Sequence, residues 1–275
     1  MSQQELADGI CTQAQISKIE KGNTNTSVDI LYKIIKRLGV DYHYFFQIAE
    51  SQRGDYEKEI TIIIRKAVSR GNYVEVMEIV NNAEILPLFQ TDDNKQFLLW
   101  HKGISTFYLN KDPFTALDLL KQSFNLTAEN KIRYAEREVE ILISIGIIHS
   151  EIYDYKKGIE YFKEALEHLK YLPYVKDSKI KTRITYNLAK SLTKIDQFEE
   201  SIKYCDQGIH NCISLDSMYM LGNLYYQKGY NLFKTDNQEV GLNYMKKAIF
   251  VFEIQKNDRY VGYVQDEINQ LQKLQ

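Results

Sequence analysis

Short polar and cationic side chains gather in one segment near the N-terminus. Ile16 and Ile19 recur there at the spacing of a buried helical face, which turns the neighbouring Gln and Lys residues outward. Glutamine can pair with adenine, and lysine can reach phosphates or guanine, so this pattern has the chemistry of a helix that reads the major groove of DNA. A pair of surface helices that only face solvent is the alternative for this motif taken alone. The residues that we expect at DNA are Thr12, Gln13, Gln15, Ser17, Lys18 and Lys21.

A second polar group lies in the C-terminal half of the chain. Four of its residues recur at the spacing of one helical stripe, and similar amides and cations stand at the equivalent positions about forty residues further on. Amides can pair with the main chain of an extended peptide, and cations can hold a carboxylate, so we interpret the stripe as a peptide-binding face. A solvated helix face is the alternative. The expected peptide-binding residues, including two from earlier helices, are Arg183, Asn187, Lys190, Lys194, Asn223, Gln227, Tyr230, His101 and Ser144.

Motifs of catalysis and of cofactor binding are missing from the sequence. It has no Gly-rich phosphate loop, no HExxH, no GxSxG and no CxxC, and its five histidines are dispersed. Cys11, Cys205 and Cys212 do not have the spacing of a metal site. We therefore expect no enzyme, no cofactor and no bound metal, and we leave open a redox role for the cysteines.

The composition predicts helices. Only 13 Gly and 3 Pro occur among 275 residues, and both residue types disfavour helix interiors. The net charge of −2 argues against a globally basic nucleic-acid coat but allows a small DNA-reading module. No apolar run approaches the length of a membrane span, and no signal peptide is visible, so we expect a cytoplasmic protein that does not contact membranes.

The first fifty residues predict a helix-turn-helix. Ser2, Thr12 and Ser27 are candidate N-caps, and Glu5 completes a capping box with Ser2. Two short helices joined by a tight turn, with the second ending at Gly22, match the form of this motif.

The remainder predicts about five degenerate repeats of paired helices. Aromatic residues that open each second helix are spaced by 41, 41 and 43 residues, and small residues recur at two fixed positions around these marks. Such a repeat is an α-solenoid. We expect an all-α protein with a helix-turn-helix domain at 1–50, a linker at 51–58, and a repeat domain at 59–275 that ends in a polar capping helix. The aromatic marks are Tyr73, Phe114, Tyr155 and Phe198.

The N-terminal segment resembles the repressor-type helix-turn-helix family of phage and Gram-positive regulators. That family normally has one more helix before the first one predicted here. We therefore expect either an upstream in-frame extension or a poorly ordered N-terminus, and apolar surface exposed at Leu6, Ile10 and Ile30. The matching stretches are Ser2–Ala7, Gln15–Gly22, Ser27–Leu31 and Leu38–Asp41.

The combination of this motif with degenerate tetratricopeptide repeats resembles the peptide-sensing regulators of Gram-positive bacteria. This family includes Rap, Rgg, NprR, PlcR and PrgX. The resemblance is strongest to its PlcR-like members. The resemblance implies a homodimer that binds a short imported signalling peptide and a palindromic promoter, and that activates transcription in quorum sensing. It also implies that Asn187 and Asn223 contact the peptide main chain, whereas Ser144 departs from an asparagine of PlcR-like proteins. The alternative is a tetratricopeptide adaptor that binds a protein partner under peptide control without reading DNA.

Overall fold

Every regular element that the structure describes is helical, which confirms the all-α prediction. The computed structural model describes residues 1–129, 131–235 and 237–273, with only the backbone described at 42–44 and 46–55. It divides into two compact units, Met1–Ser69 and Arg70–Gln275. None of the helices in these described ranges has both the length and the hydropathy needed to cross a membrane.

The first unit begins with three short helices whose caps were visible in the sequence. The hydroxyls of Ser2, Thr12 and Ser27 each accept a hydrogen bond from the main-chain N–H three residues on, at 3.2, 3.2 and 3.4 Å. Gly22 and Gly39 follow α2 and α3 with positive φ, the conformation in which glycine ends a helix without strain. The helices are α1 (Gln3–Ala7), α2 (Gln13–Glu20), α3 (Val28–Arg37) and α4 (Tyr42–Ser69).

A small apolar core holds these short helices together. Leu6 and Ala7 of α1 pack with Ile16 of α2 and Ile34 of α3. The expectation that Leu6 exposes apolar surface is therefore wrong, because this cluster leaves only 9% of it exposed. Ile10 and Ile30 are partly buried against the same cluster.

Helix α4 is longer than the sequence suggested. Residues 51–58, which we interpreted as a linker, lie within it, and the first compact unit continues to Ser69. Four of these eight residues, Gln52, Arg53, Glu57 and Lys58, are polar but favour helix, and an isolated glycine such as Gly54 is tolerated within a helix. Polar character alone therefore did not mark the end of a helix here.

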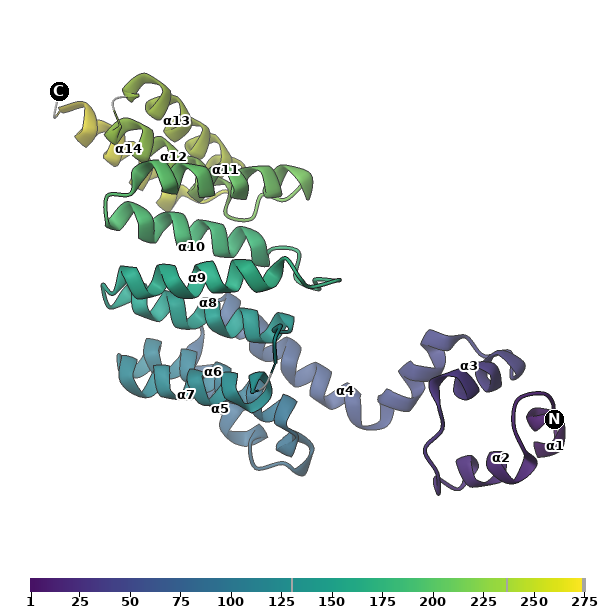
Figure 1. Cartoon of the computed structure of the whole chain (residues 1–275). Helices are drawn as coiled ribbons and strands as arrows, with labels where there is room; N and C mark the ends of the chain where they lie inside the picture. Colours follow the sequence, from purple (N-terminus) through teal and green to yellow (C-terminus); the bar gives the residue numbers. More distant parts are fainter. Residues whose placement is uncertain (130, 236, 274–275) are drawn as a thin grey trace. The chain divides into compact units, whose positions relative to one another are not determined.

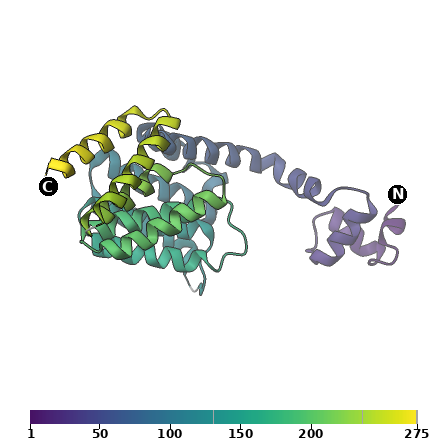
Figure 2. The ribbon, with the colours of Figure 1, turned by 90° about the horizontal axis from the view of Figure 1, so that it is seen from above.

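The second unit is a stack of antiparallel helix pairs in chain order (Figures 1 and 2). Each of its second helices begins at, or one residue before, the residue that marks the repeat in the sequence, which confirms the solenoid. The elements are α5 (Tyr73–Ala83), η1 (Pro87–Gln90), α6 (Asp92–Asn110), α7 (Pro113–Ala128), α8 (Glu136–Glu151), α9 (Tyr155–Leu169), α10 (Ile180–Lys194), α11 (Phe198–Ser214), α12 (Leu221–Lys234), α13 (Gln238–Ile254) and α14 (Asp258–Lys273).

Small residues at the crossings let paired helices approach closely. A Cβ atom added at Gly146 of α8 would lie 2.6 Å from the Phe162 ring of α9. One added at Gly229 of α12 would lie 2.7 Å from the carbonyl oxygen of Gly241 in α13. Both distances are shorter than a non-bonded contact permits, so these repeat positions require glycine.

Candidate functional site

Helix α2 presents most of the residues that we expect at DNA. Its N-cap Thr12 precedes it, and Ile16 is buried with 1% exposure, so the opposite face is turned outward. Among the expected residues, Gln15 and Ser17 are half-buried, whereas the others are exposed. The exposed residues are Thr12, Gln13, Lys18 and Lys21.

Two contacts that sequence reasoning missed hold the three short helices together. The amide of Gln3 in α1 donates to the Glu20 carboxylate in α2 at 2.5 Å. Arg37 of α3 donates to main-chain carbonyls at the end of α1, including that of Leu6 at 3.3 Å and that of Asp8. A cation that satisfies the last carbonyls of a short helix fixes its C-terminus. Helix α2 is thus tied to α1, and α1 in turn is tied to α3.

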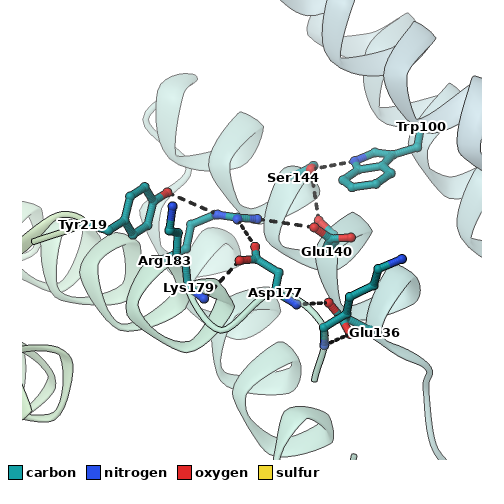
Figure 3. Close-up of polar contacts among 9 residues, drawn as sticks. Trp100, Glu136, Glu140, Ser144, Asp177, Lys179, Arg183 and Tyr219 are labelled. Carbon is teal, nitrogen blue, oxygen red and sulfur yellow. Dashed lines mark hydrogen bonds and ion pairs between the residues drawn. The ribbon is translucent and has the colours of Figure 1, made fainter. Parts of the chain in front are cut away.

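In the solenoid, Arg183 of α10 binds carboxylates of its own chain (Figure 3). Its guanidinium lies 2.5 Å from the Asp177 carboxylate and 3.6 Å from that of Glu140, and its Nε donates to the Tyr219 hydroxyl at 3.4 Å. Glu136 accepts hydrogen bonds from the main-chain N–H groups of residues 176 and 177, at 2.6 and 2.8 Å. We call these residues the Arg183 cluster. A ligand carboxylate would have to compete with both acidic side chains for this cation.

Two further expected residues lie on the inner helices next to this cluster. Ser144 of α8 accepts a hydrogen bond from the indole N–H of Trp100 at 2.9 Å and donates to the Glu140 carbonyl. His101 of α6 is buried with 2% exposure between the Phe97 and Trp100 rings, and its Nδ1 lies 2.8 Å from the Phe97 carbonyl oxygen. The geometry gives both residues partners within the chain.

Five of the nine expected peptide-binding residues line a single cavity. It has a volume of about 520 Å³, within the range of small-molecule sites, and lies between α10, α12, α13 and α14. Asn187 lies on the same helix as two of these residues but donates its amide to the Arg183 carbonyl at 2.8 Å. The five residues at the cavity are Lys190, Lys194, Asn223, Gln227 and Tyr230.

Helix α14 supplies a wall that sequence reasoning missed. We expected this helix only to cap the array, yet Tyr260, Tyr263 and Glu267 of α14 line the cavity. The signal in the sequence was the pair of tyrosines three residues apart, beside the apolar face of this helix. Together with the tyrosines of α10 and α12, they make the cavity aromatic on one side.

Cations and neutral hydroxyls give the cavity its polarity. Lys190 forms an ion pair with Glu151 at 3.2 Å, whereas Lys194 is exposed and makes no ion pair with any described residue. Burial raises the pKa of Tyr186 to about 12, and burial also raises that of Tyr226, whose hydroxyl lies 3.2 Å from that of Tyr263. These phenols are therefore neutral near pH 7 and can hydrogen-bond but cannot attract a cation as phenolates.

The two buried cysteines, Cys205 and Cys212, and the acidic residues give no support for redox or metal chemistry in the described part of the chain. Burial raises the pKa of Cys205 to about 12, so little of its thiol is ionised near neutral pH. Across the described residues, no group of three His, Cys, Asp or Glu side chains has a geometry that could hold a metal ion.

The fold and these sites define a class of protein, a helix-turn-helix module joined to a tetratricopeptide-like solenoid. The description "RNPP family C-terminal domain" matches residues 63–270, and "Helix-turn-helix" matches residues 1–45. The chain therefore belongs to the RNPP family, whose helix-turn-helix members are peptide-sensing transcription regulators. A search of curated proteins finds no match.

Solved structures show the same architecture. The complex of Bacillus thuringiensis PlcR with the peptide PapR7 and DNA is 27% identical, covers 96% of this chain and 93% of its own, and superposes with a TM-score of 0.76. Apo PlcR is 24% identical, over 97% and 98% of the two chains, with a TM-score of 0.72. Rgg2, a pheromone receptor of Streptococcus dysgalactiae, is 15% identical over 98% and 94%, with a TM-score of 0.59, and shows the fold alone.

Proposed function

We propose that this chain is a quorum-sensing regulator that binds a short imported peptide in the cavity between α10, α12 and α14, and promoter DNA through α2. The observation that carries the proposal is the convergence of predicted stripe residues from two repeats on one cavity. The 27% identical PlcR, solved with a peptide and DNA, supports both ligands.

The lining assigns a role to each part of the peptide. Lys194, which has no ion pair with a described residue, holds a carboxylate, and Lys190 can join it by leaving Glu151. Asn223 and Gln227 pair with the peptide main chain, as amides do in extended-peptide sites. The aromatic wall from α14 takes apolar side chains of the peptide.

The same proposal includes the state in which the chain acts. Two chains pair in the cytoplasm, and their two α2 helices read the halves of a palindromic promoter. The peptide-bound dimer activates transcription. Pairing, palindrome and activation rest on the likeness to PlcR-like proteins.

An electrophoretic mobility experiment tests the proposal. The DNA is the promoter next to the chain's own gene, and the peptides are synthetic copies of short secreted peptides encoded beside it. We expect a shift that at least one peptide strengthens. Binding of a peptide without any DNA shift would instead support the adaptor that does not read DNA.

A double variant tests the peptide-binding face itself. Replacing Lys190 and Asn223, which both line the cavity, with Ala should abolish the response to peptide and leave the helical content intact, because neither side chain belongs to the buried core. Circular dichroism serves as the control for folding. Unchanged peptide affinity in the double variant would refute the assignment of this face.

A further inference from the structure

A row of polar side chains runs from the cavity into the interior. It begins at Gln227 of α12, which has 7% exposure, and half-buried Thr193 of α10, both of which line the cavity. It continues to Asn231 of α12 and Ser201 of α11. Asn231 and Ser201 are fully buried. Burying polar groups is costly unless they are hydrogen-bonded, so this row needs a complete set of partners.

The distances form one continuous chain of hydrogen bonds, which we call the Gln227 chain. The Gln227 Nε2 atom lies 2.7 Å from the Thr193 hydroxyl, and that hydroxyl lies 2.8 Å from Asn231 Oδ1. The Asn231 Nδ2 atom lies 2.6 Å from the Ser201 hydroxyl, which in turn lies 2.8 Å from the Ala189 carbonyl oxygen. None of these side-chain atoms is left buried without a partner.

The carbonyl at the end of the chain sets its direction. Ala189 O can only accept, and the hydroxyls of Ser201 and Thr193 both lie within hydrogen-bond distance of it, at 2.8 and 3.0 Å. Each hydroxyl has one proton to donate. If the Thr193 hydroxyl donates its one proton to the Ala189 carbonyl or to Asn231 Oδ1, it has none left to donate to Gln227. It then accepts a hydrogen bond from the Gln227 NH₂ group. If every hydrogen bond in the chain ran in the opposite direction, both hydroxyls would donate elsewhere and neither would donate to the Ala189 carbonyl.

This direction decides which end of the Gln227 amide meets the cavity. Its Nε2 is engaged by Thr193, whereas its Oε1 has no hydrogen-bond partner among the described residues. Gln227 borders the cavity, so Oε1 is the free group there. An amide that could flip would accept or donate equally well, but this one is held as an acceptor.

We propose that Thr193, Asn231 and Ser201 are positioning residues, which hold Gln227 as a hydrogen-bond acceptor and so select a ligand that presents an N–H group at this point. The inference rests on the proposed function and names the group that the peptide must offer. A rigid acceptor rejects a ligand that lacks the donor, because that ligand would cover the Gln227 oxygen without giving it a hydrogen bond.

Three variants isolate the positioning effect. Thr193→Val removes the hydroxyl and keeps the shape, so the Gln227 amide loses its anchor. Thr193→Ser restores the hydroxyl. Thr185→Val is the matched control, because Thr185 lies fully buried on the same helix but donates only to carbonyls of that helix, at 3.0 and 3.1 Å.

The first measurement needs no ligand. In nuclear magnetic resonance spectra of the full chain, the side-chain amide protons of Gln227, assigned by their loss in Gln227→Leu, should exchange slowly with water. We expect fast exchange in Thr193→Val and slow exchange in Thr193→Ser and Thr185→Val. Slow exchange that persists in Thr193→Val would overturn the proposal.

The second measurement uses a heptapeptide selected from a random library by its binding to the wild-type chain. Each main-chain N–H is replaced in turn by an ester oxygen. The replacement opposite Gln227, identified by its lost effect in Gln227→Leu, should weaken binding about tenfold in the wild type and in Thr185→Val. In Thr193→Val the same ester replacement should weaken binding less than about threefold, and in Thr193→Ser it should again weaken binding about tenfold.

The outcomes distinguish a failure of the positioning role from a failure of the proposed function. A peptide that binds with the same ester sensitivity in Thr193→Val overturns the positioning role and leaves the proposed function standing. A library that yields no binding peptide overturns both.

Discussion

At the residue scale, the surroundings of a cation decide what it can bind. Arg183 and Lys194 lie on the same stripe of α10, and sequence spacing treats them alike. In the structure, Arg183 is balanced by two carboxylates, one of which belongs to the buried Glu140, whereas Lys194 is exposed and makes no ion pair with a described residue. Arg183 thus joins helices, and Lys194 remains available to a ligand.

This difference predicts that two alanine substitutions affect different properties: Arg183→Ala the stability of the fold, and Lys194→Ala the binding of peptide. Arg183→Ala should lower the free energy of unfolding by about 2 kcal/mol, because it removes the guanidinium that lies 2.5 Å from the Asp177 carboxylate and 3.6 Å from the buried Glu140 carboxylate. Lys194→Ala should leave stability within about 0.5 kcal/mol and weaken peptide binding. Urea unfolding and fluorescence anisotropy of a labelled peptide measure the two effects. The assignment fails if Lys194→Ala unfolds at lower urea than Arg183→Ala.

At the element scale, the sequence predicted where helices begin better than what their side chains meet. Local signals were sufficient for the caps at Ser2, Thr12 and Ser27, because each cap bonds within its own turn. The wall formed by α14 and the Arg183–Glu140 ion pair join different helices of the solenoid, and no local periodicity encodes such contacts. Five cavity residues were found because the repeat places equal positions of successive helices side by side.

The close helix crossings give a prediction about glycine. Gly229→Ala should destabilise the chain by about 1–3 kcal/mol, because the added methyl group would meet the main chain of α13. Gly262→Ala is the matched control in α14, where an added Cβ has nothing within 4 Å. It should stabilise the helix by up to about 1 kcal/mol. Thermal unfolding of both variants checks the pair, and equal shifts would contradict a packing requirement at Gly229.

The start of α8 predicts a pH dependence. Burial acts to raise the pKa of Glu138, but hydrogen bonds from Lys131, Thr127 and the Ala135 N–H outweigh it and lower the pKa. Because the folded value lies below the unfolded value of 4.5, this carboxylate stabilises the fold above about pH 4.5. The contribution is lost as the pH falls through the folded pKa.

Urea unfolding at pH 6 and pH 3.5 measures this effect. The stability lost between the two values should be smaller in Glu138→Gln than in the wild type. The control Glu253→Gln, at an exposed position in α13, should lose as much as the wild type. A loss in Glu138→Gln equal to that of the wild type would show that another group carries the acid sensitivity.

At the scale of the whole molecule, one chain combines α2, the helix that we propose binds DNA, with a cavity in a separate compact unit. If peptide binding shifts a dimer toward the spacing of two half-sites, the coupling between the two ligands is a free energy and must be reciprocal. The peptide should therefore raise affinity for the promoter about 5- to 150-fold, and the promoter should raise affinity for the peptide by the same factor.

Half-site geometry provides the control for this coupling. DNA with a single half-site should bind without any response to peptide, because it does not report the distance between two α2 helices. Inserting about five base pairs between the half-sites turns them to opposite faces of the duplex and should remove the response as well. Titration calorimetry with promoter, half-site and phase-shifted DNA measures all three cases. A response to peptide that survives on the single half-site would place the coupling within one chain and would contradict a mechanism based on dimer spacing.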